Sequence, residues 1–327
     1  MSEMNMVEAI NLALKQEMKR DKKIVIIGED VGKDGGVFRV TDGLMQLYGK
    51  ERVMDSPLAE SGIVGTSIGM AIAGLKPICE IQFEGFIFPA IDQLVSHASR
   101  IRNRSRGHYS VPMVVRCPIG GGIKALEHHS ESPEGYLIHT PGLKVVIPSG
   151  PYDAKGLLIS AIRDPDPVIF FEPKKIYRAI KEEVPSKEYT IPLGKANIVK
   201  KGKDVTLITY GAWVKTAREA VSKIPDVDVE IIDLRTLSPL DTSTIIESVK
   251  KTGKCVIVQE APRTLGLASE IIARINEKAL YSLQAPIERV TGFDIIMPLR
   301  KFEDYNLPSE KKIIAAIEKV IREAKNG

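Results

Sequence analysis

Two kinds of hydrophobic pattern alternate along this chain of 327 residues. Short, continuously apolar runs, such as 24–27 and 168–171, are separated by segments in which apolar residues recur every three or four positions. Buried strands joined by amphipathic helices are typical of parallel sheets covered by helices on both faces. The sequence therefore predicts an α/β protein with two three-layer α/β/α domains and mostly parallel sheets.

The two domains are expected on either side of a stretch that loses this periodicity. Residues 172–203 are rich in Lys, Glu and Pro, and we divide the chain into domains 1–180 and 204–327 with a linker at 181–203. Strands are expected at 24–27, 52–54, 76–83, 112–117, 144–147, 168–171, 204–210, 227–232 and 254–259. Helices are expected at 5–18, after Pro57, and at 86–104, 152–163, 213–223, 241–251, 265–278 and 309–324.

The helix after Pro57 is unusual because small residues crowd it. It holds Gly62, Gly65, Gly69 and Gly74, and each glycine costs an exposed helix about 1 kcal/mol relative to alanine. We interpret this as a sign that another helix or subunit packs closely against it. Glu60, in its first turn, has two interpretations: a buried acid with chemistry to perform, or an acid placed favourably at a helix N-terminus.

Overall composition excludes several classes of function. The net charge of +4 is small, and basic and acidic residues are interleaved, so the chain has no basic stripe of the kind that binds nucleic acid. No apolar run is long enough to cross a membrane. Cys79, Cys117 and Cys255 lie far apart beside apolar runs. Such spacing favours buried thiols in a reducing compartment, and we expect a cytoplasmic protein.

Two loops that follow strands carry candidate chemistry. Gly28-Glu29-Asp30 ends the first strand before a glycine-rich loop, which is either an active-site rim or a solvated turn. His128 and His129 lie in the glycine-rich connection 118–135, where adjacent side chains of an extended segment point to opposite sides. Without a neighbouring ligand a zinc site is not favoured. One histidine is either an active-site imidazole or a solvated loop residue.

The segment 83–106 combines aromatic and basic residues. Phe83, Phe86 and Phe88 fall within six residues and form either part of the core or a platform for a planar ring. Four arginines lie at positions 100, 102, 104 and 106. They either complement a helix C-terminus or offer a docking surface to an acidic partner. The sequence holds no G-x-x-x-x-G-K-[ST], so it lacks a phosphate clamp of this kind.

Several short strings in this order resemble one family along nearly the whole chain. They are Gly28-Glu-Asp-Val31, Asp55-Ser-Pro-Leu-Ala-Glu60, Pro77-Ile-Cys-Glu-Ile-Gln-Phe83, Ala90-Ile-Asp-Gln93, His129-Ser-Glu-Ser-Pro-Glu134, Pro141-Gly-Leu-Lys-Val-Val146, Asp233-Leu-Arg-Thr-Leu-Ser-Pro239 and Thr291-Gly-Phe-Asp294. The family is the β subunit of the thiamine-diphosphate-dependent 2-oxoacid dehydrogenase E1 component. The resemblance implies a transketolase-like pyrimidine-binding domain followed by a transketolase C-terminal-like domain.

The resemblance also implies half of a cofactor site. In this family the β subunit holds the pyrimidine side of thiamine diphosphate, and the α subunit holds Mg²⁺ and the diphosphate through a Gly-Asp-Gly motif, which this chain lacks. By this resemblance Glu60 hydrogen-bonds the pyrimidine N1′, Phe86 stacks on the ring, and Gln82 lies beside it. His129 helps transfer the acyl group to the lipoyl group of the E2 component. An α2β2 heterotetramer with E1 α, and E2 as a further partner, are implied.

Two finer expectations follow from the same resemblance. Some family members bind a structural K⁺ through backbone carbonyls, and the corresponding positions here are Val111, Met113, Val114, Ala161, Asp164 and Asp166. The segments 129–134 and 169–173 are closer to branched-chain members, so we expect oxidative decarboxylation of a branched-chain 2-oxoacid. The alternatives are a pyruvate or acetoin dehydrogenase E1 β subunit, or a non-catalytic scaffold that docks a partner.

Overall fold

The computed structural model describes residues 1–326, and Gly327, the last residue of the predicted second domain, lies outside them. The chain forms two compact units. The first comprises residues 1–119 and 136–193, and the second comprises residues 120–135 and those from 194 onward. Each unit contains its own mainly parallel sheet, as the alternating pattern predicts.

In the first unit, parallel strands run in the order β6-β7-β5-β4-β2-β3. Their bounds are β2 Ile24–Gly28, β3 Val53–Asp55, β4 Lys76–Glu80, β5 Val114–Ile119, β6 Lys144–Val146 and β7 Val168–Pro173. A separate antiparallel pair joins β1 (Ser2–Met4) to β8 (Glu182–Val184). The helical segments are α1 Met6–Arg20, α2 Leu44–Tyr48, α3 Glu60–Ile72, η1 Glu84–Ala90, η2 Gln93–Ala98, α4 Ile101–Arg104, α6 Pro151–Arg163 and η4 Lys174–Ile176.

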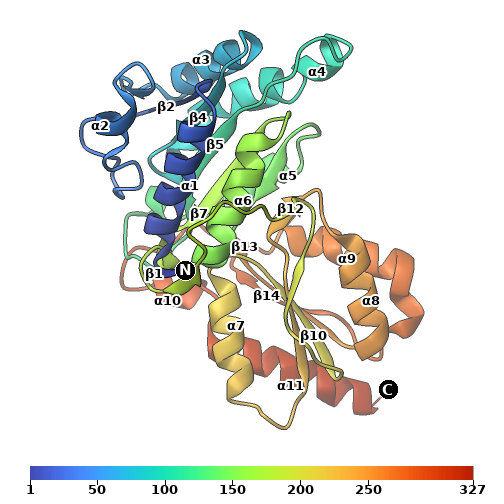
Figure 1. The fold of residues 1–327 in the computed structure, drawn as a ribbon. Helices are drawn as coiled ribbons and strands as arrows, with labels where there is room; N and C mark the ends of the chain where they lie inside the picture. The colour runs from blue at the N-terminus through green and yellow to red at the C-terminus, as the bar shows by residue number, and fades with distance from the viewer. Residues whose placement is uncertain (327) are drawn as a thin grey trace. The chain divides into compact units, whose positions relative to one another are not determined.

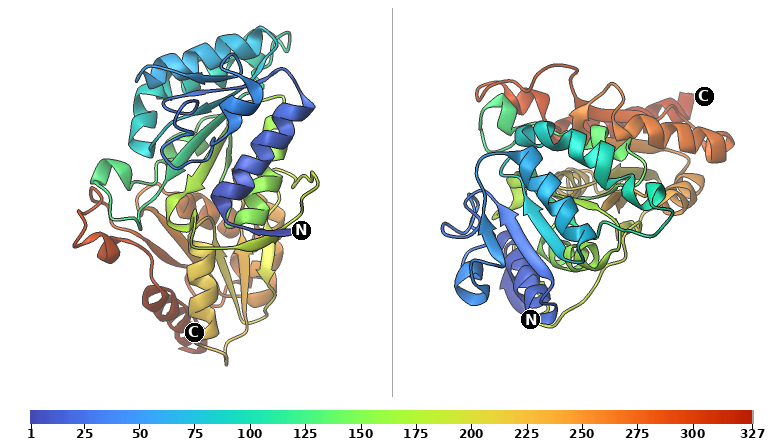
Figure 2. Two further views of the ribbon diagram at one scale, coloured as in Figure 1. Left: turned by 60° about the vertical axis from the view of Figure 1, so that its left-hand side comes forward. Right: turned by 90° about the horizontal axis from the view of Figure 1, so that it is seen from above.

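Helices cover both faces of this first sheet. Helices α1 and α6 pack against each other, and α3 packs against β4 (Figure 1). Figure 2 shows α1 on one side of the strands and α3 on the other. The start of α1 is fixed by a reciprocal capping box, in which Asn5 accepts the Glu8 N–H and the Glu8 carboxylate accepts the Asn5 N–H.

In the second unit, strands run in the order β14-β13-β10-β11-β9, and only β9 is antiparallel to its neighbour. Their bounds are β9 Asn197–Lys200, β10 Val205–Thr209, β11 Val229–Asp233, β13 Cys255–Pro262 and β14 Glu288–Gly292, with β12 at Thr236–Ser238. The helical segments are η3 Glu127–His129, α7 Trp213–Ser222, α8 Thr242–Thr252, α9 Leu267–Ala279, η5 Leu280–Ser282, α10 Glu303–Asn306 and α11 Glu310–Asn326. Helix α5 (Glu134–Ile138) begins in this unit and ends in the first.

The second sheet is also sandwiched between helices. Side chains of α7 and α11, including Trp213, Ile313 and Ile317, share one buried cluster with Leu207 and Val256 of the sheet. Helices α8 and α9 pack against each other, away from α7 and α11 (Figure 1). Among residues 1–326, no helix combines the length and apolar character needed to span a bilayer.

Three expectations differ from the structure. The predicted helix 86–104 is instead a 3-10 segment (η1), a π segment (η2) and the short α4, because Pro89 lacks the N–H that a continuous α-helix requires. Residues 181–203, expected as a linker, contribute β8 to the first unit and β9 to the second. Residues 120–135, expected in the first domain, group with the second unit.

The arginines near α4 have local partners. The Arg104 guanidinium donates to the Ser96 carbonyl at 2.7 Å, and Arg102 pairs with Asp166 at 2.5 Å. Basic side chains near the end of a helix commonly donate hydrogen bonds to its last carbonyl groups. These contacts account for two of the four arginines without a docking partner.

Candidate active site

Strand order brings several polar residues to one edge of the first sheet. Gly28 of β2 lies opposite Asp55 of β3 and Glu80 of β4, so these three parallel strands end side by side. The chain passes from β2 to β3 on one flank and then to β4 on the other. Open α/β sheets bind ligands beyond the carboxyl ends of the strands at such a reversal. Glu29 directly follows β2 there, and Gln82 lies two residues after the end of β4.

Glu60 begins helix α3 and is only 6% exposed. The residue before it, Ala59, provides no side-chain cap. The carboxyl group is therefore buried and also lies at a helix N-terminus, where a negative charge is favoured. Helix α3, which begins at Glu60, packs against β4 and against η1, the segment that carries Phe86.

Glu29 is a second buried acid in this unit, 7% exposed. Burial raises the pKa of its carboxyl group, and the charges of Glu60 and Asp30 raise it further. Its Oε1 atom makes no hydrogen bond within the described residues. The sequence marked Glu29 only as part of a rim or turn; the signal that identifies it is a buried carboxyl beside a second one.

Gln82 and Phe86 lie just after β4, four residues apart. Both side chains are partly buried. The Gln82 amide donates to the Asp30 carboxylate at 2.9 Å. The Phe86 ring meets Phe83 edge-on with centroids 6.3 Å apart, and Phe83 in turn contacts Phe38 at 5.3 Å. Phe83 and Phe86 thus belong to one aromatic cluster, and both keep some accessible surface.

Asp55 ties the glycine-rich loop after β2 to β3. Its carboxylate accepts the Gly32 N–H at 2.6 Å and the Lys33 N–H at 3.1 Å. A Cβ on Gly32 would lie 2.9 Å from this carboxylate, so a larger residue would displace it. This contact fixes the start of the loop that follows Glu29.

A buried charged layer supports the strands that carry these residues. Arg116 of β5 is 1% exposed and donates two hydrogen bonds to Glu172 of β7, at 2.7 and 2.9 Å, and another to Glu80 of β4. Tyr177 donates to Glu172 at 2.6 Å. Burial alone would lower the pKa of Arg116, but the charges of Glu172 and Glu80 outweigh it and raise the pKa. The cation is therefore retained.

His129 belongs to the second unit, whereas Glu60, Gln82 and Phe86 belong to the first. It ends the 3-10 segment η3, and its N–H donates to the Leu126 carbonyl at 2.9 Å. The expectation of an extended segment was wrong here: the two histidine rings are tilted by 37° with centroids 6.0 Å apart. His128 is exposed and His129 is partly buried.

The positions assigned to K⁺ lie around β5, the end of α6 and the loop before β7. Carbonyls of Val111, Met113 and Ala161 already accept backbone N–H groups. Lys144 pairs with Asp164 at 2.6 Å, and Arg102 pairs with Asp166. Among residues 1–326, no cluster of three or more His, Cys, Asp or Glu side chains is arranged to hold a metal. The K⁺ site stays a prediction.

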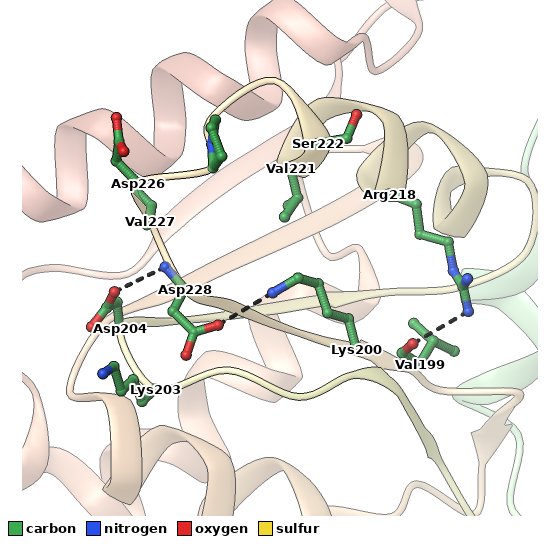
Figure 3. A pocket seen from close by; sticks show the side chains of 11 residues that line it. Val199, Lys200, Lys203, Asp204, Arg218, Val221, Ser222, Asp226, Val227 and Asp228 are labelled. Atoms are coloured by element: carbon green, nitrogen blue, oxygen red, sulfur yellow. Dashed lines mark hydrogen bonds and ion pairs between the residues drawn. The ribbon is translucent and has the colours of Figure 1, made fainter.

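A pocket of about 800 Å³ in the second unit contains none of the predicted residues (Figure 3). Its charges balance, because three basic residues (Lys200, Lys203 and Arg218) and three acidic residues (Asp204, Asp226 and Asp228) line it. Lys200 reaches Asp228 at 3.3 Å, and Asp204 accepts the Asp228 N–H at 2.8 Å (Figure 3). This pocket lies where β10 and β11 begin, at the end of the sheet opposite to the edge at which parallel sheets bind ligands. We assign it no function.

Both units match known families. Residues 2–180 match the family described as "Transketolase, pyrimidine binding domain", and residues 194–313 match "Transketolase, C-terminal domain". A solved structure titled "Split gene transketolase, inactive beta4 tetramer" is similar with a TM-score of 0.79, covering 98% of each chain at 20% sequence identity. That likeness supports the predicted two-domain α/β fold.

Closer relatives share the full length. The "Pyruvate dehydrogenase E1 component subunit beta" of Acholeplasma laidlawii is 56% identical, covering 98% of this chain and 99% of that protein. Proteins of the same name are 49% identical in Mycoplasma genitalium (98% and 99% covered) and 50% identical in Staphylococcus aureus (96% and 97% covered). These names do not support the branched-chain expectation. The chain belongs to the β subunits of the thiamine-diphosphate-dependent 2-oxoacid dehydrogenase E1 component.

Proposed function

We propose that this chain is the β subunit of an E1 component that decarboxylates pyruvate and passes the acetyl group to a lipoyl group. The observation that carries the proposal is the pair of buried acids, Glu29 and Glu60, beside Gln82 and Phe86 at the carboxyl edge of the first sheet. The relatives named pyruvate dehydrogenase favour pyruvate over the branched-chain substrate.

The residues at this edge fit the pyrimidine end of thiamine diphosphate. Bound there, the cofactor supplies a carbon nucleophile that attacks the 2-oxo group and accepts its electrons when carbon dioxide leaves. Glu60 holds the proton at the pyrimidine N1′. Phe86 offers its ring for stacking. Glu29 has a buried oxygen that makes no hydrogen bond within the described residues.

Burial is central to the role of Glu60. A carboxyl group shielded from water keeps a short, stable hydrogen bond to a ring nitrogen and does not exchange its proton freely with solvent. The small residues of α3 allow a planar ring or a partner helix to approach the backbone beside it. Asp55 and the Arg116 layer hold the loops and strands in place, so the acids are positioned before the cofactor binds.

The other half of the site is assigned to the α subunit. The chain lacks the sequence motifs that cradle phosphates and the Gly-Asp-Gly motif of the family, so Mg²⁺ and the diphosphate fall to E1 α in an α2β2 assembly. His129 is assigned to acyl transfer toward E2, and the carbonyl positions around β5 and α6 to K⁺. A cytoplasmic location remains part of the proposal, and three buried free cysteines support it.

Reconstitution tests the proposed function. The chain is mixed with its α subunit, thiamine diphosphate and Mg²⁺. Decarboxylation is measured with pyruvate and with a branched-chain 2-oxoacid, and release of acetaldehyde is measured with acetoin. We expect activity only with both subunits and the highest kcat/KM with pyruvate. Decarboxylation by the purified β chain alone contradicts the half-site. A higher kcat/KM for either other substrate contradicts the pyruvate assignment.

A further inference from the structure

The loop that carries His129 starts with three glycines and closes on itself. Gly120 donates its N–H to the Glu131 carbonyl at 2.9 Å, which joins the two ends of the segment. Gly120 and Gly122 have φ values of +83° and +98°, which favour glycine. This backbone turns the N–H groups of Gly121 and Gly122 toward two acids of the second unit.

Glu260, near the end of β13, accepts a hydrogen bond from the first of these N–H groups. Its carboxylate accepts the Gly121 N–H at 2.5 Å and the Trp213 indole N–H at 3.0 Å. The side chain is 7% exposed. A Cβ on Gly120 would lie 3.0 Å from the same carboxylate, so a larger residue at position 120 would crowd Glu260.

Glu303, the first residue of α10, accepts a hydrogen bond from the other loop N–H group, that of Gly122. Its carboxylate accepts the Gly122 N–H, and a Cβ on Gly121 would lie 2.8 Å from it. Glu303 is 1% exposed. Lys124, within the loop, lies 3.6 Å from Glu303 and pairs with Asp304 at 2.5 Å. Burying a carboxylate is unfavourable unless donors compensate it. Here the loop backbone supplies one N–H donor to each acid, in addition to the Trp213 indole and the Lys124 ammonium group.

The far end of the loop has its own anchor. Tyr210, just after β10, donates its hydroxyl to Glu134 at 2.7 Å, and both side chains are buried. Burial raises the pKa of the Glu134 carboxyl. The segment between these anchors contains η3 and His129, so the second unit fixes it at both ends.

We propose that Glu260 and Glu303 are positioning residues that hold His129 for acyl transfer. The second unit then contributes to the reaction through this loop. The inference rests on the proposed role of His129. It assigns neither acid a contact with substrate or cofactor.

The test uses the assembled α/β protein with Glu260→Gln and, separately, Glu303→Gln. Each amide keeps one acceptor oxygen but adds a donor opposite a donor, so the hydrogen bonds to the loop weaken. Amide hydrogen exchange is followed for residues 120–135. Decarboxylation with an artificial electron acceptor and acetyl transfer to a lipoyl domain are measured in parallel. Glu270→Gln, in an exposed ion pair with Arg274 on α9, is the matched control.

We expect exchange at Gly121 and Gly122 to rise at least 10-fold in the two variants and not in the control. The ratio of acetyl transfer to decarboxylation should fall at least 10-fold. Unchanged exchange overturns the proposed contacts. Faster exchange with an unchanged ratio, where His129→Ala lowers that ratio, overturns the positioning role. If either variant fails to assemble, Tyr210→Phe tests the other anchor by the same two readouts.

His129→Ala separates this inference from the proposed function. If that variant transfers acetyl groups normally, the role assigned to His129 fails, whatever the exchange data show. If it is defective while Glu260→Gln and Glu303→Gln keep the normal ratio, the role of His129 stands and the positioning role of the two acids fails.

Discussion

Glu29 and Glu60 form a pair of buried acids: burial raises the pKa of the Glu29 carboxyl, and the negative charge of Glu60 raises it further. A buried carboxyl group whose pKa is raised by a neighbouring acid is characteristic of sites that move protons. Glu60 lies at the start of α3 and Glu29 follows β2. The pairing therefore depends on two segments that adjoin only in the folded sheet.

Glu60→Gln tests the first of these acids. The amide keeps the size of the side chain but cannot hold an acidic proton at the pyrimidine N1′. We expect exchange of the thiamine C2 proton in the assembled protein to slow by about 10²–10⁴-fold, with α/β assembly unchanged. Proton exchange is followed by NMR after mixing with D₂O, and the exposed Glu51→Gln is the control. A normal exchange rate in Glu60→Gln would remove this residue from the mechanism.

Glu29→Gln should change how stability depends on pH. The pKa of Glu29 is higher in the folded chain than its ordinary value of 4.5, so the folded state binds the proton more tightly than the unfolded state. Its contribution to stability is fully present below pH 4.5 and is lost as pH rises through the folded pKa. Glutamine cannot ionise. The variant should match the wild type at low pH and become the more stable of the two toward pH 7.

Thermal unfolding of the cofactor-free chain across this range checks the prediction for Glu29. Glu51→Gln again serves as control, because it removes a carboxylate that is exposed. A melting-temperature difference between Glu29→Gln and wild type that does not grow with pH would contradict the assigned cause.

Arg116→Met should destabilise the first unit strongly. It removes the shared cation of two buried carboxylates, Glu80 and Glu172, and breaking such an arrangement typically costs about 3–5 kcal/mol. Urea unfolding measures the loss. Lys215→Met, which breaks an exposed pair with Glu219, should cost less than about 1 kcal/mol. Replacing both glutamates by glutamine in the Arg116→Met background should recover part of the loss; no recovery would refute uncompensated charge as its cause.

Gly69 tests the interpretation of the small residues in α3. No atom lies within 4 Å of a Cβ built at this exposed position. Gly69→Ala should therefore raise the stability of the isolated chain by about 0.5–1 kcal/mol. Gly69→Leu should raise the Kd for the α subunit at least 10-fold, because the larger side chain prevents close approach of a partner helix.

Analytical ultracentrifugation of the mixed subunits measures that Kd. Lys250→Leu, an exposed position on α8, shows how much any new apolar side chain affects association. Equal Kd values for the two leucine variants would show that α3 does not face the α subunit.

Local patterns in the sequence determined a large part of this protein. Continuous apolar runs predicted the parallel strands, because strands covered on both faces bury every side chain. The capping box at α1 is also a local feature, because its partners Asn5 and Glu8 are three residues apart. The ordered strings from Gly28 to Asp294 indicated the family, which the full-length relatives confirm. Pro89 was also visible, but its effect on the expected helix was missed.

Tertiary structure alone decided which distant residues meet. Arg116 bonds Glu80 and Glu172 because β5 lies between β4 and β7, and no local pattern encodes strand order. Glu29 acquires its raised pKa from burial and from Glu60, neither of which exists in an unfolded chain. The three glycines before His129 suggested a loop. That they give their N–H groups to Glu260 and Glu303 depends on contacts more than 130 residues apart, which only folding brings together.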